Sequence, residues 1–176
     1  DEAFGHNDDQ LGLVNGVRPP KRVNGLTNIN VTLTGDPSIT NIVDTIAQTG
    51  TGKVTATAPS TSTALANYSG ITGTGHSITI PTLVDNSLAD AAAAAALVAL
   101  DAATTETITF DPATTTLASP AIVASTYANA ISILSSSGIS GFGSATVGVN
   151  ENITVAQANI LNGKTSGKIT ATISDN

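Results

Sequence analysis

The strongest constraint on this chain is a short segment that occurs twice. Residues 52–57 read Gly-Lys-Val-Thr-Ala-Thr and residues 167–172 read Gly-Lys-Ile-Thr-Ala-Thr, each after aliphatic residues at helical spacing. Looser copies of the same pattern lead into residues 106–110 and 144–147. With a short extra unit that ends in residues 77–80, the units average about 30 residues, a period typical of repeat architectures. The chain is therefore expected to be built from degenerate repeats.

Each unit combines a helical pattern with a strand pattern. Residues 39–46 place four aliphatic side chains on one helical stripe, and Asp36 or Ser38 can cap that helix. After a glycine-containing turn, residues 53–57 alternate between polar and apolar side chains, which is the period of a strand. The same alternation in residues 28–34 predicts a strand with one buried face. Val155, Ala158 and Leu161 repeat the helical stripe near the C-terminus.

An alanine run at residues 91–96 lies in a helix predicted over residues 87–103, capped by Asp85, Asn86 or Ser87. Alanines let this helix approach a neighbour closely. Because only 3% of residues are aromatic, the core is expected to be thin and aliphatic. We predict an α/β fold of degenerate helix–strand repeats, stacked in a solenoid-like manner. The pattern leaves open whether the strands pair in parallel or mix with hairpins.

The N-terminus differs from the rest of the chain. Residues 1–10 carry four acidic side chains, and residues 11–27 carry three basic ones among several glycines and prolines. We predict an extended N-terminal arm or linker over residues 1–27 and a single repeat-built domain over residues 28–176. The arm is either a disordered tail or a segment that docks on a neighbouring subunit through its charge blocks.

Composition excludes several classes of protein. The chain has 176 residues, no cysteine and a net charge of −7 with only six lysines and arginines. It therefore has no thiolate site, and its charge argues against a nucleic-acid partner. No apolar run is long enough to span a membrane.

The chain starts with Asp1 rather than Met, which we interpret as removal of a secretory signal, trimming of a virion protein, or a piece of a longer chain.

Candidate chemistry is sparse. The run 50–53 (Gly-Thr-Gly-Lys) lacks the spacing of a phosphate loop and is interpreted as a repeat turn. His6 lies in an acidic segment that is more typical of a solvated tail than of a cation site, and His76 is expected to cap a turn. The glutamates are scattered, and few aromatics are present to bind a sugar. We predict no enzyme activity, no catalytic or metal-binding residue and no cofactor.

Three segments resemble a known class of proteins: residues 69–75, 87–105 and 153–175. They are similar to the Thr/Ala-rich helix–strand repeats of giant extracellular proteins of cyanobacteria and marine bacteria, which are grouped with haemolysin-like, surface-layer or adhesin proteins. The resemblance covers residues 36–176 and implies a secreted structural or adhesive role. It also implies a related possibility, a fibre or decoration of phages that infect such hosts. The calcium-binding nonapeptide of the family does not occur, which argues against calcium dependence.

The two ends of the repeat region suggest how the chain functions. The strands predicted at residues 28–34 and 168–173 would leave open backbone edges, which natural proteins normally cover. We expect other copies of the chain to cover them, with the N-terminal arm contributing a strand. The residues predicted to mediate this assembly are Arg18, Lys21, Arg22, Ile29, Val31, Leu33, Ile169 and Ile173.

We therefore predict a structural subunit of an extracellular or cell-surface filament, surface layer or matrix fibre. It would be a homo-oligomer or polymer that also contacts other structural proteins or surface glycans. One alternative is a bacteriophage decoration, knob or fibre protein located in the virion. Another is an adhesin module that binds glycans or a surface.

Overall fold

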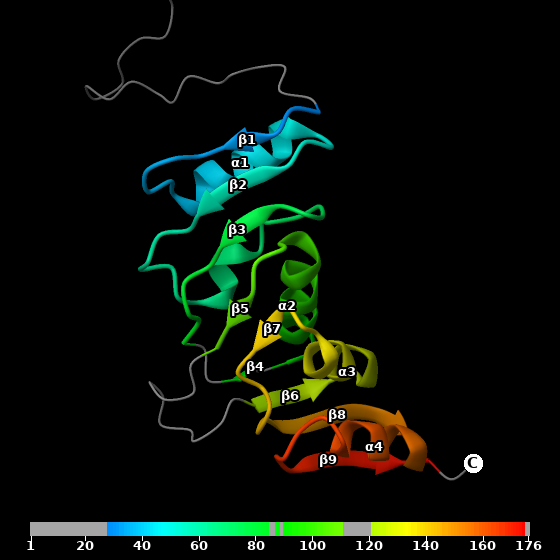
Figure 1. The fold of residues 1–176 in the computed structure, drawn as a ribbon. Coiled ribbons are helices and arrows are strands. Elements are labelled where there is room, and N and C mark those ends of the chain that lie inside the picture. The colour runs from blue at the N-terminus through cyan, green and yellow to red at the C-terminus, as the bar shows by residue number, and fades with distance from the viewer. Residues whose placement is uncertain (1–27, 85–86, 89, 111–120, 175–176) are drawn as a thin grey trace, which may run out of the picture.

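The computed structural model describes residues 28–84, 87–88, 90–110 and 121–174. Its helices are α1 (Ile39–Thr49), α2 (Ala91–Ala103), α3 (Tyr127–Ser135) and α4 (Val155–Asn162), with a 3-10 helix, η1 (Leu65–Tyr68). They alternate with short strands (Figure 1): β1 (Val31–Thr32), β2 (Val54–Thr57), β3 (Ser77–Thr79), β4 (Ser87–Leu88), β5 (Ile108–Thr109), β6 (Ala121–Ser125), β7 (Ile139–Ser140), β8 (Thr146–Ile153) and β9 (Ile169–Ile173). The predicted arm, residues 1–27, lies outside the described residues.

The strands form three small parallel sheets. Their strand orders are β1-β2-β3, β4-β6-β8-β9 and β5-β7. Every strand pair in the described residues is parallel, including the isolated bridges His76–Thr104 and Leu83–Phe110. The mixed α/β class is therefore confirmed, and the open question of strand direction is answered. The described sheets do not close into a barrel.

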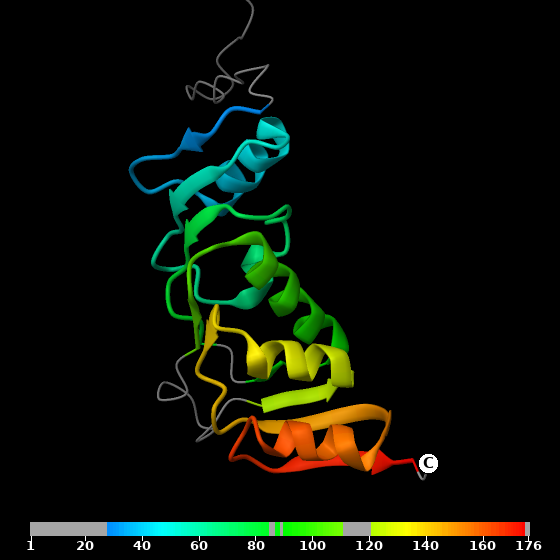
Figure 2. The same ribbon diagram turned by 45° about the vertical axis from the view of Figure 1, so that its right-hand side comes forward.

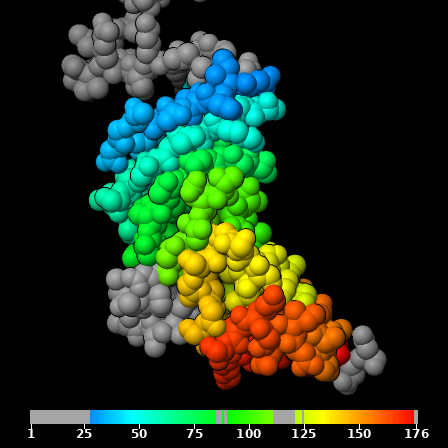
Figure 3. All heavy atoms as spheres, viewed as in Figure 1, coloured from blue at the N-terminus to red at the C-terminus, as the bar shows by residue number. Residues whose placement is uncertain are grey.

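The molecule is elongated, with β1 at one end and β9 at the other (Figures 1 and 2). The space-filling view shows the chain progressing along this length in sequence order (Figure 3). Side-chain hydrogen bonds join neighbouring units. They include the bond from the Thr165 hydroxyl to the Ala145 carbonyl, 20 residues apart, and the bond from Ser136 to Asp101, 35 residues apart.

Side-chain caps define where the helices begin. The Ser38 hydroxyl accepts a hydrogen bond from the Asn41 amide at 3.2 Å, as one of the predicted caps requires. Thr154 and Gln157 form a reciprocal capping box at α4. The predicted start of the alanine-rich helix is wrong. Its cap is Asp90, whose carboxylate accepts from the Ala93 amide at 2.8 Å, because Ser87 instead belongs to β4, which pairs with β6.

The strand predictions were incomplete in the C-terminal half. Strand β6 is a continuous apolar segment, so it lacks the alternation that identifies half-buried strands. Strand β7 has only two residues, too few to show a period. Strand β8 extends to Ile153, well past the segment predicted at residues 144–147. These strands depend on pairing with distant segments, which a local pattern does not contain.

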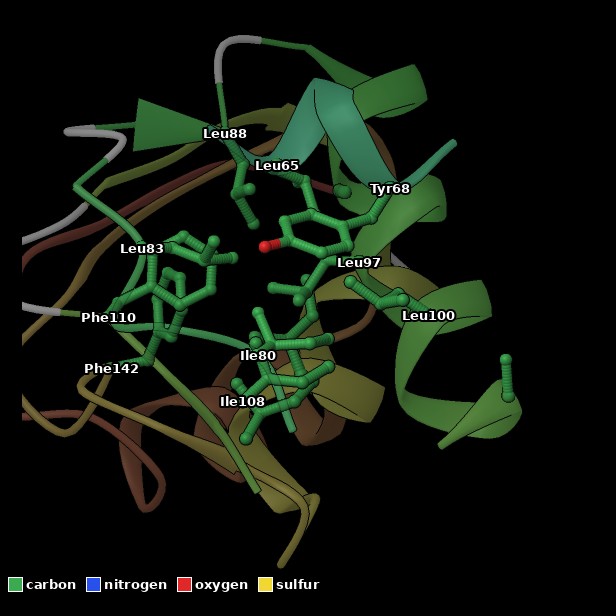
Figure 4. Close-up of a cluster of buried hydrophobic side chains, with 14 of the residues drawn as sticks. Leu65, Tyr68, Ile80, Leu83, Leu88, Leu97, Leu100, Ile108, Phe110 and Phe142 are labelled. Atoms are coloured by element: carbon green, nitrogen blue, oxygen red, sulfur yellow. The ribbon is translucent and has the colours of Figure 1, made fainter. Parts of the chain in front are cut away.

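One continuous hydrophobic cluster runs through the described residues, from Ile42 to Leu161. Most of it is aliphatic, as predicted, but aromatic side chains lie within it. Phe110 and Phe142 pack edge to face with ring centroids 4.8 Å apart. Tyr68 joins the same cluster (Figure 4). Its hydroxyl donates to the Ser62 carbonyl at 2.6 Å, and burial raises its pKa to about 12.

The repeated glycine before each lysine has a steric role. A Cβ atom at Gly52 would overlap the carbonyl group of Ile29, and a Cβ atom at Gly167 would overlap the carbonyl of Ala145. Neither glycine has a positive φ, so the requirement is space rather than backbone conformation. The two Gly-Lys segments are places where one unit lies directly against the backbone of the preceding unit.

The substitution Gly167→Ala is expected to lower the free energy of unfolding by about 1–3 kcal/mol, because an added methyl group forces backbones apart in a packed region. Gly143→Ala is the matched control, since a Cβ atom there meets no atom within 4 Å. Urea unfolding of both variants measures the difference. Equal stabilities of the two variants would contradict the close-approach account.

Candidate assembly site at the end strands

The predicted assembly residues of the described chain fall into two groups at opposite ends. Ile29, Val31 and Leu33 lie on or beside β1, the outer strand of the three-stranded sheet. Ile169 and Ile173 belong to β9, the outer strand of the four-stranded sheet. The structure thus groups the members of each set but separates the two sets by the length of the molecule (Figure 1). Arg18, Lys21 and Arg22 lie outside the described residues.

The outer edge of β1 directs backbone groups away from the other described strands. The Val31 and Leu33 amides donate to the Lys53 and Thr55 carbonyls of β2, at 2.8 and 2.9 Å. In a parallel ladder, successive residues direct their backbone groups to opposite sides. The N–H and C=O groups of Thr32 therefore point away from β2. No described strand pairs with this side of β1.

The outer edge of β9 has the complementary pattern. The Lys168 carbonyl accepts from the Val147 amide at 2.8 Å, and the Ser174 amide donates to the Ile153 carbonyl at 2.9 Å. Both of these residues face β8. By the same alternation, the backbone groups of Ile169, Ala171 and Ile173 point away from β8. No described strand pairs with them.

Aliphatic side chains accompany both edges. Ile29 is 50% exposed and Ile173 is 42% exposed, which is high for isoleucine. Val31 and Leu33 are half-buried. At the other end, Ile169 and Ala171 are also half-buried against the core. We call residues Ile29, Val31, Thr32 and Leu33 the N-terminal end surface, and residues Ile169, Ala171 and Ile173 the C-terminal end surface.

Two exposed residues on α4 were missed as candidates. Val155 was expected on the buried stripe of the helix, but it is 61% exposed, and Ile160 is 47% exposed. Only Leu161 of this helix is fully buried. The sequence does carry a signal for this exposure, because Ile160 falls off the stripe that contains Ala158 and Leu161. An aliphatic residue off the stripe is a candidate for an external contact.

Charged residues of the described chain differ between the two ends. Asp36 follows β1 and Asp44 lies on α1, and both are exposed. Lys164 and Lys168 flank the turn between α4 and β9, and both are exposed. Exposed Lys53 also lies at the first end, beside β2, and exposed Glu151 at the last end, in β8, so among the described residues the two ends differ only in net charge, slightly negative at the first and slightly positive at the last.

His76 is a buried residue whose ring bonds the turn that it is predicted to cap and also contacts β2. It is 3% exposed. Its Nδ1 accepts a hydrogen bond from the Val54 amide at 3.1 Å, and its Nε2 donates to the Thr72 carbonyl at 3.1 Å. Burial lowers its pKa below the ordinary 6.5, and the nearby Lys53 charge acts in the same direction. The neutral ring links β2 to the turn before β3.

Other polar side chains also connect neighbouring units. The Ser77 hydroxyl donates to the Glu106 carboxylate at 2.6 Å, and Ser136 donates to Asp101 at 2.8 Å. The described residues contain no cluster of three or more His, Cys, Asp or Glu that could hold a metal ion. Within the same residues, no helix has the length and apolar character needed to cross a membrane.

The face of the sheets that carries Thr side chains is open. Thr32 pairs with Thr55, Thr57 with Thr79, and the Ser140 hydroxyl donates to Thr109 at 3.0 Å. On the four-stranded sheet, an open depression of about 370 Å³ is lined by residues that include Val123, Thr146, Asn150, Lys168 and Thr170. Its lining offers hydroxyl, amide and ammonium groups beside an exposed valine.

Comparison with known proteins adds no relative. No protein-family model, curated protein or solved structure matches the chain. The functional interpretation therefore depends on the end strands, the open face and the buried polar contacts described above.

The buried His76 makes stability depend on pH. Because its pKa is lower in the folded state than the ordinary 6.5, the unfolded state takes up the proton first as the pH falls. The stabilisation is complete above about pH 6.5 and is lost progressively below it. His76→Asn keeps an acceptor for the Val54 amide but does not titrate, so its free energy of unfolding should change less between pH 7.5 and 5.5.

Urea unfolding at several pH values measures this difference, and NMR titration gives the pKa of His76 directly. Equal pH dependence in the two proteins, or a His76 pKa at or above 6.5, would contradict the assignment.

Proposed function

We propose that this protein is a non-enzymatic structural subunit of an extracellular or cell-surface assembly, such as a filament, surface layer or matrix fibre. The observation that carries the proposal is a pair of strand edges, on β1 and β9, with which no described strand pairs. The outermost strands β1 and β9 both direct backbone groups away from the molecule, and both are accompanied by exposed aliphatic side chains. Natural proteins rarely leave such edges uncovered.

We also propose that the helix–strand units form a solenoid-like stack. The parallel pairing of every described strand supports this interpretation. So do the hydrogen bonds that connect equivalent positions of successive units, such as Lys53 with Asn30 and Val54 with His76. In a stack of this kind each unit contacts only its neighbours, and among the described units the first and the last each have a neighbour on one side only.

The free energies of hydrogen bonding and of association indicate that backbone pairing alone is too weak to hold the copies together. A hydrogen bond contributes about 0.5–1.5 kcal/mol net, so the few bonds that one short edge can form supply only a few kcal/mol. Association costs about 4–15 kcal/mol in lost rigid-body freedom. The exposed Ile29, Ile160 and Ile173 must therefore contribute by burial. The N-terminal arm with Arg18, Lys21 and Arg22 is proposed to add further contacts.

A second candidate function is a surface-binding adhesin module. The specific observation that favours it is the exposed sheet face. This face carries paired threonines, such as Thr32 with Thr55 and Thr57 with Thr79, and the depression on the four-stranded sheet. Hydroxyl and amide groups on such a face suit a glycan ligand, and a glycan array tests for it directly. A phage decoration or fibre protein remains a variant of the assembly proposal, with the virion in place of the cell surface.

Proline substitutions at the outward-facing residues test the assembly proposal. Thr32→Pro and Ala171→Pro each remove an N–H group that points away from the neighbouring strand, so they block an edge without breaking an internal ladder bond. We expect the unmodified chain to form concentration-dependent oligomers in sedimentation velocity. Both variants should remain monomeric and folded by circular dichroism.

Leu33→Pro is the matched control, because it removes the bond from the Leu33 amide to the Thr55 carbonyl. This variant should lose stability, whereas Thr32→Pro should not. An unmodified chain that stays monomeric at every concentration would overturn the proposed function.

A further inference from the structure

We propose that the two end surfaces bind each other. Strand β9 of one copy pairs in parallel with β1 of the next, with Ile169 opposite Val31 and Ala171 opposite Leu33. The contact is head-to-tail, so each copy uses its C-terminal end surface toward one neighbour and its N-terminal end surface toward the other. This inference rests on the proposed function, which requires only that the ends associate.

The backbone geometry of the two edges supports this pairing. Within the chain, Val31, Leu33 and Val147 lie on the buried or half-buried face and direct their amides toward the following strand. The amides of Ile169 and Ala171 in β9 likewise point to the side where a following strand would pair, but no described strand lies there. Thr32 of β1 has backbone groups that point to the side where a preceding strand would pair, and no described strand lies there. A β9–β1 pair supplies each edge with the partner that the internal strands have.

In the proposed β9–β1 pair, the half-buried and the exposed faces of the two strands would align. In a parallel pair, opposing residues place their side chains on the same face of the sheet. The proposed register therefore aligns half-buried Ile169 and Ala171 with half-buried Val31 and Leu33 on one face. On the other face it aligns exposed Thr170 with exposed Thr32. This arrangement repeats the internal pairing of Thr32 with Thr55.

Charge favours unlike ends over like ends. Among the described residues, Lys164 and Lys168 outweigh Glu151 at the C-terminal end, and Asp36 and Asp44 outweigh Lys53 at the N-terminal end. A symmetric contact between two C-terminal ends would bring four lysines onto one interface. A head-to-tail contact brings lysines and aspartates together, which favours encounter and orientation at low ionic strength.

The geometric consequence is a ring or a filament rather than a dimer. A heterologous contact generates a ring if the rotation between copies closes and a filament if it does not, whereas a symmetric contact stops at a dimer. The two arrangements therefore differ in the size of the product that a covalent link between the ends can trap.

Engineered cysteines test the pairing directly, because the chain contains none. Neighbouring strands are about 4.7–4.9 Å apart, which suits a disulfide between opposing residues. The chain carrying both Thr32→Cys and Thr170→Cys is expected to give a ladder of covalent oligomers after oxidation, seen on non-reducing gels and reversed by a reductant. Both positions are exposed, so circular dichroism should show an unchanged fold.

Three controls define the register and polarity. The pair Thr32→Cys with Thr172→Cys is shifted by two residues and should cross-link much less. The pair Thr34→Cys with Thr172→Cys restores the register and should give the ladder again. Each single variant, Thr32→Cys or Thr170→Cys, should give no covalent product on a non-reducing gel, and a mixture of the two should yield only the mixed covalent dimer.

Covalent dimers of either single variant would show symmetric pairing and overturn the inference. Absence of cross-links in every variant, while the cysteine-free chain still forms oligomers, would also overturn it and leave the proposed function standing. If the cysteine-free chain forms no oligomers at all, the proposed function and the inference fail together.

Discussion

Each short strand of this protein depends on the strand before it and the strand after it. Strands such as β1, β5 and β7 have two residues each and cannot exist in isolation. They persist because successive units lie close enough for the backbones to pair. At Gly52 and Gly167 that approach leaves no room for a side chain. The fold is therefore a set of mutually supporting units, and in the part of the chain that the structure describes no strand pairs with the outer edges of β1 and β9.

The buried polar residues serve the same contacts between units. His76 offers a ring nitrogen to the Val54 amide, and Thr165 donates to the Ala145 carbonyl. These bonds satisfy backbone groups just before the β2–β3 and β8–β9 ladders begin, which limits the cost of burying them. The chain thus uses its few polar core residues to hold units together, and the same need for a neighbour explains why the end strands are the proposed assembly site.

Local chemistry allowed several elements to be predicted. The stripe of aliphatic residues and the Ser38 cap identify α1, and the alternation in residues 53–57 identifies β2. The start of α2 was misplaced because several residues before the alanine run can cap a helix, and only the pairing of β4 with β6 selects Asp90. Strand direction and the internal role of His76 depend on long-range contacts. The location of Ile29, Val31, Leu33, Ile169 and Ile173 at the two ends of the described repeats follows from the sequence, whereas the exposure of Val155 does not.

The most direct test of the account is amide hydrogen exchange at Thr32 and Ala171, measured at low and high protein concentration. Both amides point out of the outermost strands, so they are expected to exchange rapidly in dilute solution. As the ends of different copies pair, exchange at both positions should slow together, while the amides of Val31 and Leu33 change little. Exchange that remains rapid at every concentration, or that is already slow in a monomer, would contradict the claim that these edges are open and are closed by assembly.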